Sequence, residues 1–269
     1  MKRINNLINQ SNQPNLIRKI HKSAKSRFKT ILFVLSVITV QAFPQSPTQI
    51  LDAVDKNLSA DSRVVESTMV VHGKRNNRTM TSKSYTEGTV KSFSEYLSPA
   101  RDKGTKMLKL EKELWLYSPS TDRTILISGH MLRQSVMGSD LSYEDVMDDR
   151  KLTETYNAEL SGQEEVDGRP CWVLSLKAKV DDVAYDAQKI WIDQERLVPL
   201  RQELYAKSGQ MLKRILLSDV RQIDGRWFPM KMNYKDVLKE GDGTDYIITN
   251  IEFNKPIPAY IFSKAGLKQ

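Results

Sequence analysis

From residue 63 to residue 253, hydrophobic and polar positions alternate along most of the chain with a period of two. Such alternation is typical of β-strands that bury one face. It predicts thirteen strands, at residues 63–72, 78–87, 89–97, 105–110, 113–118, 123–128, 155–163, 170–178, 187–193, 198–206, 211–221, 227–237 and 244–253. Asp167-Gly168, Asp224-Gly225 and Asp242-Gly243 separate neighbouring runs, and Asp-Gly between alternating runs is a strong hairpin signal. The pattern predicts an antiparallel meander, without the strand–helix–strand order of a parallel nucleotide-binding sheet.

One helix is predicted ahead of the strands, beginning at Pro47 and running through TQILDAVDKNL. Ser46 can cap it, and proline suits the first helical position. Four apolar residues recur on one face at helical spacing: Ile50, Leu51, Val54 and Leu58. We expect this face to pack against another apolar surface.

The segment from His130 to Arg150 lacks strand alternation and is rich in methionine. It predicts a loop and a short helix capped by Ser142, with Asp145 three residues later. Methionine is flexible and polarizable, and it is favoured on surfaces that adapt to varied apolar partners. The segment therefore suits a lid over an apolar cavity, and ordinary core packing is the alternative.

The N-terminal region has the order of a secretory signal. Residues 2–29 are basic and contain no acidic residue, residues 30–40 are apolar, and Val40-Gln41-Ala42 is a small-x-small cleavage pattern. The apolar run is much shorter than the roughly 20 residues that span a membrane. Residues 1–42 are therefore interpreted as a cleavable signal peptide, with an uncleaved anchor as the alternative. The expected location is the periplasm, and residues 43–269 are expected to form a single domain.

Removal of the signal changes the charge balance. The whole chain has 41 Lys and Arg against 33 Asp and Glu, a net charge of +8, but residues 1–42 hold 8 of the basic residues and no acidic one. The remainder thus has 33 of each and a net charge of 0. Binding to nucleic acid needs a basic surface, so no nucleic-acid partner is expected. The single cysteine, Cys171, excludes a disulfide within the chain and is expected to be a buried structural residue.

Catalytic signatures are sparse. After residue 42 the only histidines are His72 and His130, and no zinc, serine-hydrolase or phosphate-loop motif is present. No catalysis, cofactor or metal is therefore expected. One acidic cluster could hold Ca²⁺ or Mg²⁺, but a solvated helix face is the preferred interpretation because the spacing of a calcium loop is missing. This cluster comprises Asp140, Glu144, Asp145, Asp148 and Asp149.

Two stretches carry a resemblance to a known family. They are EKELWLYSPSTDRTI at residues 111–125 and SVMGSDLSYEDVMDD at residues 135–149. Together they resemble the LolA-like family, in its outer-membrane lipoprotein-sorting branch. The later stretches DGRPCWVLSL, KIWIDQERLVPLRQELY and DGRWFPMKM fit the order of hairpins in that family.

The resemblance implies a mainly β fold: an unclosed antiparallel barrel, or strongly curved sheet, with short helices over its concave side. It implies a soluble periplasmic carrier that binds acyl chains of lipoproteins or lipids in an apolar cavity, for transfer to the outer membrane. An inner-membrane transporter and an outer-membrane acceptor are the implied partners. An interaction or sensor module that partners a membrane transporter, and a hydrolase with a dispersed acid–base pair, are the alternatives.

Ten residues are predicted to contact the ligand: Leu108, Leu110, Trp115, Tyr117, Met131, Leu132, Met137, Leu141, Tyr143 and Trp172. Along the strand at residues 113–118, Leu114 and Leu116 point to one side, and the two aromatic residues point to the other. The aromatic side is assigned to the cavity, because strand aromatics often line an apolar ligand site.

Overall fold

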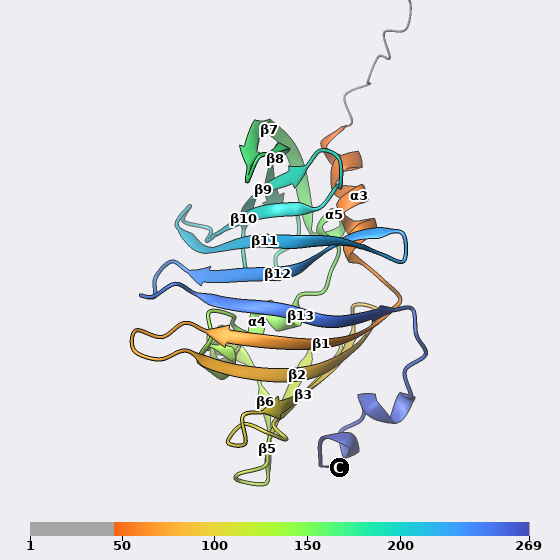
Figure 1. Ribbon diagram of the computed structural model, residues 1–269, viewed down its shortest axis with the longest axis vertical. Helices are drawn as coiled ribbons and strands as arrows, with labels where there is room; N and C mark the ends of the chain where they lie inside the picture. The colour runs from red at the N-terminus through yellow and green to blue at the C-terminus, as the bar shows by residue number, and fades with distance from the viewer. Residues whose placement is uncertain (1–45, 269) are drawn as a thin grey trace, which may run out of the picture. The chain divides into compact units, whose positions relative to one another are not determined.

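The computed structural model describes residues 46–268 (Figure 1). The predicted signal peptide, residues 1–42, lies outside the described residues. The first element is helix α3 (Pro47–Leu58). Its start is fixed by a capping box, in which the Gln49 amide donates to Ser46 Oγ at 3.2 Å and the Ser46 amide donates to Gln49 Oε1 at 2.9 Å. The predicted helix and its cap are confirmed.

Thirteen strands form one antiparallel sheet, as the alternation predicts. The strands are β1 (Ser62–Val71), β2 (Arg78–Glu87), β3 (Lys91–Ser98), β4 (Lys106–Leu110), β5 (Glu113–Ser118), β6 (Arg123–Ile127), β7 (Tyr156–Val166), β8 (Arg169–Ala178), β9 (Ala187–Asp193), β10 (Pro199–Tyr205), β11 (Met211–Ile223), β12 (Arg226–Asp236) and β13 (Thr244–Phe253). Their order is β6-β5-β4-β3-β2-β1-β13-β12-β11-β10-β9-β8-β7. The sheet is open, with β6 and β7 at its edges, so the predicted unclosed meander is confirmed.

The long connection between β6 and β7 carries short helices. They are η1 (Gly129–Arg133), η2 (Val136–Gly138), α4 (Tyr143–Met147) and α5 (Leu152–Thr155). Helix α4 has the predicted cap, since the Asp145 amide donates to Ser142 Oγ and the Ser142 amide donates to Asp145 Oδ2 at 2.6 Å. Among residues 46–268, no helix is both long and apolar enough to cross a membrane.

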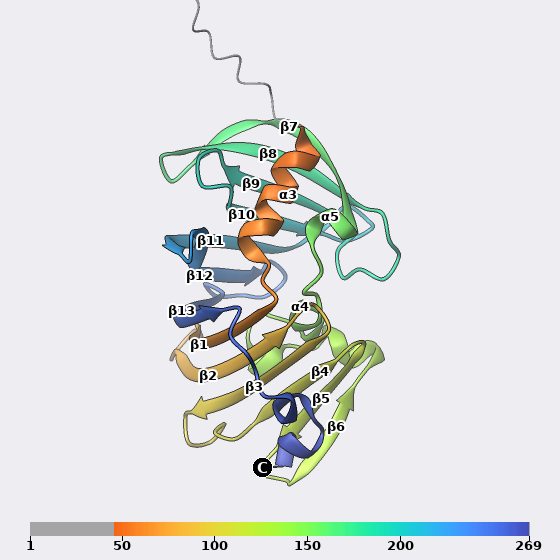
Figure 2. The same cartoon turned by 90° about the vertical axis from the view of Figure 1, so that its right-hand side faces the viewer.

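Strand register assigns each side chain to one of two faces. The concave face bears residues that lie opposite one another in neighbouring strands, such as Met80 against Met69 and Tyr234 against Ile215. Helix α3 lies across this face (Figure 2), where Ile50, Leu51 and Val54 pack against residues of β8 and β9. The short helices therefore cover the concave side, as the family resemblance implies.

The C-terminal segment covers part of the opposite, convex face. It contains η3 (Ala259–Phe262) and η4 (Ala265–Lys268), which lie over β3 and β4 (Figure 2). Phe262 and Leu267 are buried there against Phe93 and Leu108. One half of the sheet thus has its convex face covered by the end of the chain.

Candidate ligand-binding cavity

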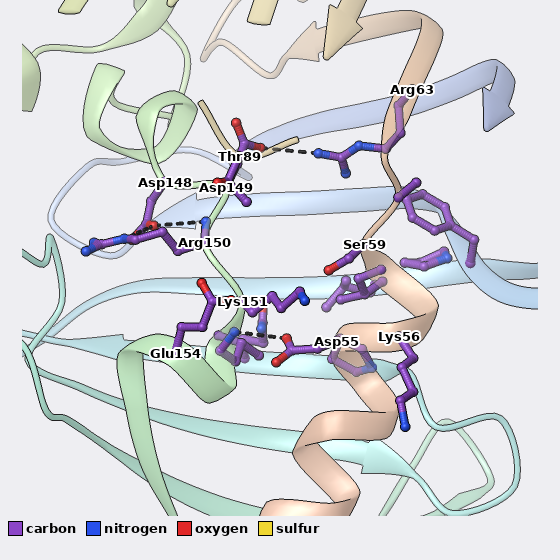
Figure 3. A pocket seen from close by; sticks show the side chains of 18 of the residues that line it. Asp55, Lys56, Ser59, Arg63, Thr89, Asp148, Asp149, Arg150, Lys151 and Glu154 are labelled. Atoms are coloured by element: carbon purple, nitrogen blue, oxygen red, sulfur yellow. Dashed lines mark hydrogen bonds and ion pairs between the residues drawn. The ribbon is translucent and has the colours of Figure 1, made fainter. Parts of the chain in front are cut away.

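A cavity of about 800 Å³ lies on the concave side between helix α3, residues 148–154 and strands β10–β12 (Figure 3). Its floor is apolar and comes mainly from two neighbouring strands. Leu217 on β11 lies opposite Met232 on β12, and Ile215 lies opposite Tyr234. Phe228 and Pro199 extend the floor. Because side chains alternate between faces along a strand, Leu217 is 7% exposed and its neighbour Leu216 is 41% exposed on the other side.

Charged side chains surround the mouth of this cavity. In Figure 3, Arg63 on β1 reaches across to Asp149, with Nη2 and Oδ1 3.3 Å apart. The other oxygen of Asp149 accepts a hydrogen bond from Lys109 Nζ at 3.0 Å, and Lys109 also donates to the Thr89 carbonyl at 2.8 Å. Lys109 is buried, so this pair of cations fixes Asp149 against the inner side of the sheet.

Arg150 ties the same segment to the loop between β8 and β9. Its guanidinium contacts Asp148 at 2.9 Å and Asp182 at 3.0 Å, and also donates to the Asp182 carbonyl. The hydrogen bond from Arg150 lowers the pKa of the Asp182 carboxyl. Residues 148–150 are thus held from both sides and form a charged strap beside the mouth.

Asp55 joins helix α3 to helix α5. Its carboxylate accepts hydrogen bonds from the amides of Leu152 and Thr153, both at 2.9 Å, and from the Thr153 hydroxyl at 2.7 Å. These amides are free at the start of a helix, and Asp55 is 5% exposed. Helices α3 and α5, which border the cavity mouth, are therefore connected by the buried carboxylate of Asp55 (Figure 3).

Two smaller pockets continue the cavity inward. One of about 190 Å³ shares Ile215, Gln202 and Tyr234 with the large cavity. Another of about 160 Å³ lies under the methionine-rich segment and also includes Tyr234. The segment itself packs against the concave face of β1–β6 around Met80 and Met107. The hollow thus extends along the sheet beneath α4.

A buried ion pair holds α4 to the cavity wall. Lys213 on β11 contacts Asp145 on α4, and their side chains are 5% and 11% exposed. The Tyr185 hydroxyl donates to the same carboxylate at 2.6 Å. Burial and the neighbouring Asp145 raise the pKa of Tyr185, so its hydroxyl stays protonated. We refer to Lys213, Asp145 and Tyr185 as the latch.

The preferred interpretation of the acidic cluster as a solvated helix face is wrong for three of its members. Asp145 belongs to the latch, and Asp149 pairs with Lys109. Asp140 accepts from the Thr244 hydroxyl at 2.8 Å and from the Asp236 amide at 3.0 Å. Their partners come from strands that are distant in sequence, which is why the local charge pattern could not reveal them. Within the described part of the chain, no three His, Cys, Asp or Glu side chains converge as a metal site would require.

The ten predicted contact residues fall into three separate groups. Five of them lie in or against the cluster beneath the methionine-rich segment: Met131, Leu132, Met137, Leu141 and Tyr143. Trp172 packs against the core under α3, on the same concave face. Leu108, Leu110, Trp115 and Tyr117 pack instead with Phe262 and Leu267 under the C-terminal segment.

The aromatic side of β5 therefore faces away from the cavity. Leu114 and Leu116, on the other side of the strand, pack with the methionine-rich segment. Alternation separates the two sides of a strand but does not say which one is concave. The C-terminal segment that covers the aromatic side lies more than 140 positions after β5 in the sequence, so the local pattern does not reveal it. Ligand contact by the ten residues stays a prediction.

Sequence reasoning missed the residues that form the cavity floor, chiefly Ile215, Leu217, Phe228 and Met232. The alternation of hydrophobic and polar residues predicted the strands that carry them. No nearby sequence feature indicated that these residues line a cavity. Cys171 is fully buried, and burial raises the pKa of its thiol to about 11. His72 contacts Asp245 at 3.3 Å. Neither lines the cavity.

Comparisons with known proteins agree with this architecture. A search of curated proteins gave no match. A "putative outer membrane lipoprotein-sorting protein domain" from Vibrio parahaemolyticus matches with 21% identity and a TM-score of 0.73, over 83% of this chain and 98% of that one. A DUF1329 family protein from Desulfovibrio piger matches with 24% identity and a TM-score of 0.73, over 82% and 99%. A LolA superfamily protein from Nitrosomonas europaea matches with 23% identity and a TM-score of 0.69, over 82% and 99%.

These similarities show the fold alone. Residues 88–269 also match the model of a protein family whose description reads "Uncharacterized protein". The chain therefore belongs to that family, and its fold is LolA-like.

Proposed function

We propose that the protein is a soluble periplasmic carrier that binds acyl chains of lipoproteins or lipids and delivers them to the outer membrane. The observation that carries the proposal is an apolar floor of strand residues inside a charged rim. Leu217 and Met232 represent the floor, and Arg63 and Arg150 the rim. This arrangement suits an amphiphile whose chain lies on the sheet and whose head group meets water.

The size of the cavity supports this proposal. Its volume of about 800 Å³ lies within the range of roughly 300–1,000 Å³ found for small-molecule sites. Burial of one CH₂ group contributes about 0.8 kcal/mol. A chain of about 16 carbons would therefore gain on the order of 10 kcal/mol, before the cost of immobilising it.

Release of cargo needs a part of the wall that can move. The connection between β6 and β7 is built from short helical turns, and its Val136, Leu141 and Val146 line the hydroxyl-rich inner pocket, while the flexible Met131 and Met137 pack against the cluster beside that pocket. We include the five predicted residues of this connection and Trp172 among the proposed contacts. An inner-membrane transporter and an outer-membrane acceptor are the proposed delivery partners.

The test is to express the full chain in a Gram-negative host and recover it from the periplasm. Native mass spectrometry and organic extraction then identify any bound lipid, and the mass of the recovered chain reports whether residues 1–42 are removed. Leu217→Trp fills the floor of the cavity, and Leu216→Trp is its matched control on the exposed side. We expect Leu217→Trp to lower lipid occupancy at least fivefold and Leu216→Trp to leave it unchanged.

Two results would overturn the carrier proposal. One is recovery of a folded protein that neither retains lipid nor takes up a fluorescent fatty acyl probe. The other is equal occupancy in the two tryptophan variants, which would place any bound lipid outside this cavity. A stable complex with a membrane protein, without lipid exchange, would favour the sensor alternative instead.

A further inference from the structure

The pocket beneath the methionine-rich segment has an unusual lining for an acyl-chain site. Six of its lining residues carry hydroxyl groups: Ser82, Ser84, Ser94, Tyr96, Tyr234 and Tyr246. Its roof includes Val136, Leu141 and Val146. Strands β2, β3, β12 and β13 thus bring hydroxyls from distant parts of the chain to one place. We call this the hydroxyl pocket.

The serines of this pocket are paired across strands, and the Ser84–Ser94 pair retains a free donor. Ser84 and Ser94 are 2.9 Å apart, and Ser82 lies 2.9 Å from Ser67. A serine hydroxyl has one proton to donate and two lone pairs. One hydrogen bond within the Ser84–Ser94 pair uses one of its two protons and leaves one O–H for another partner, whereas Ser67 of the other pair also interacts with the Tyr246 hydroxyl.

The tyrosines add donors that lack good partners. Tyr96 is only 5% exposed, and its hydroxyl has no hydrogen-bond partner among residues 46–268 but is not one of the fully buried unpartnered atoms, so it keeps some accessible surface. The Tyr234 hydroxyl meets only the Met232 sulfur, at 3.6 Å, and a thioether is a weak acceptor. Burial raises the pKa of both tyrosines, so both remain protonated donors. Donors that keep accessible surface in a pocket can bond to a ligand that enters it.

The charges around the hydroxyl pocket indicate which kind of hydrogen-bond acceptor a ligand would present. No cation lines it, and its one charged residue is Asp145, a carboxylate. Arg78 lies near Tyr96 but outside the lining, so a ligand carboxylate or phosphate placed here would meet the Asp145 carboxylate first, and like charges at such a site repel. A neutral acceptor, such as the carbonyl oxygen of an ester or amide, fits the available donors without that penalty.

We propose that the hydroxyl pocket binds the carbonyl of an ester- or amide-linked acyl group, and so makes the protein select acyl lipids over alkyl chains of equal length. This inference rests on the proposed carrier function. Tyr234 lines both the large cavity and the hydroxyl pocket. An aliphatic chain on the cavity floor can therefore have its carbonyl among these hydroxyls. Its head group can still meet water at the charged rim, because Arg63 of the rim lies two residues before Val65, the β1 residue paired with Ser84.

The experiment uses two amphiphiles that differ in the carbonyl group. They are 1-palmitoylglycerol, which has an ester carbonyl, and 1-O-hexadecylglycerol, which has an ether link and a chain of the same length. The full chain is expressed, the protein is recovered from the periplasm, and each amphiphile is titrated to displace a bound fluorescent fatty acyl probe. We expect the ester to bind on the order of tenfold more tightly, which corresponds to one or two net hydrogen bonds.

Two variants remove donors from the pocket: Tyr96→Phe, and the double variant Ser84→Ala/Ser94→Ala. Each should lower the ester-to-ether preference severalfold while retaining affinity for the ether. Ser175→Ala is the matched control, because Ser175 forms a cross-strand hydroxyl pair with Ser161 that is exposed and outside the pocket. Equal urea midpoints establish that the variants are folded.

The outcomes separate this inference from the carrier function. If the wild-type protein binds ester and ether equally, the hydroxyl pocket does not select for a carbonyl group, and this inference is overturned. The proposed carrier function is unaffected by that result. If the pocket variants keep the preference, the donors lie elsewhere and the inference is overturned. If the folded protein binds neither amphiphile and does not bind the probe, the carrier function itself fails.

Discussion

The latch, formed by Lys213, Asp145 and Tyr185, provides a sharp test of how helix α4 is held against the concave face of the sheet. Within the described residues, Asp145 on α4 is the only carboxylate that forms an ion pair with Lys213. Replacement by Asn in Asp145→Asn keeps the size of the side chain and removes its charge. The ammonium of Lys213, 5% exposed, would then be buried without an ion-pair partner, although the Glu144 carboxylate, beyond ion-pair distance, still attracts it.

The expected loss is large because of this burial. Removal of one partner from a buried ion pair costs about 3–5 kcal/mol. We expect Asp145→Asn to lower the free energy of unfolding by an amount in this range. Adding Lys213→Met removes the stranded charge and should restore most of the loss, since a buried pair can often be replaced by apolar residues at little cost.

Urea unfolding at pH 7 measures both effects, and hydrogen exchange of the amides at residues 141–147 reports on local opening of α4. Asp219→Asn is the control, because Asp219 pairs with Arg221 at the surface, where their side chains are 45% and 60% exposed. Such pairs contribute little, so no measurable change is expected. The reasoning is refuted if Asp145→Asn is no more destabilising than the control, or if Lys213→Met adds to the damage.

Other consequences follow from single contacts. Although burial raises the pKa of Asp193, hydrogen bonds from Arg169 and from two backbone amides lower it overall. Its carboxylate therefore stabilises the fold above about pH 4, and the contribution is lost as the pH falls through the lowered pKa; Asp193→Asn should flatten the pH dependence of urea unfolding in this acidic range. Phe262→Ala should cost about 3–5 kcal/mol in the same assay and leave lipid binding unchanged, because Phe262 packs on the convex face. Reduced lipid binding in that variant would contradict the assignment of faces.

Local patterns predicted most of the secondary structure. A period of two gave the thirteen strands, and the caps at Ser46 and Ser142 were readable because capping depends on residues only three positions apart. The open antiparallel order followed from short turns between strands. These features depend on neighbours in sequence, so one sequence is enough to find them.

The cavity could not be predicted in the same way, because it depends on contacts between distant segments. Trp115 is shielded by residues near the C-terminus, and Asp145 meets Lys213 nearly 70 positions away. Neither partner is visible from local spacing. The large aromatic residues suggested the ligand-facing side, whereas the structure uses them to pack the convex side.

The distribution of side-chain size between the two faces accounts for the hollow. On the convex side of β3–β5, large residues such as Phe93 and Trp115 pack against the C-terminal segment. On the concave side of β2 and β3, serines occupy the positions opposite Ser67 and Ser84, and they fill little of the space beneath the methionine-rich segment. Protein interiors are otherwise close-packed, so these small side chains leave a void. The same serines that leave this space also line it with donors, and a ligand that fills it must satisfy them.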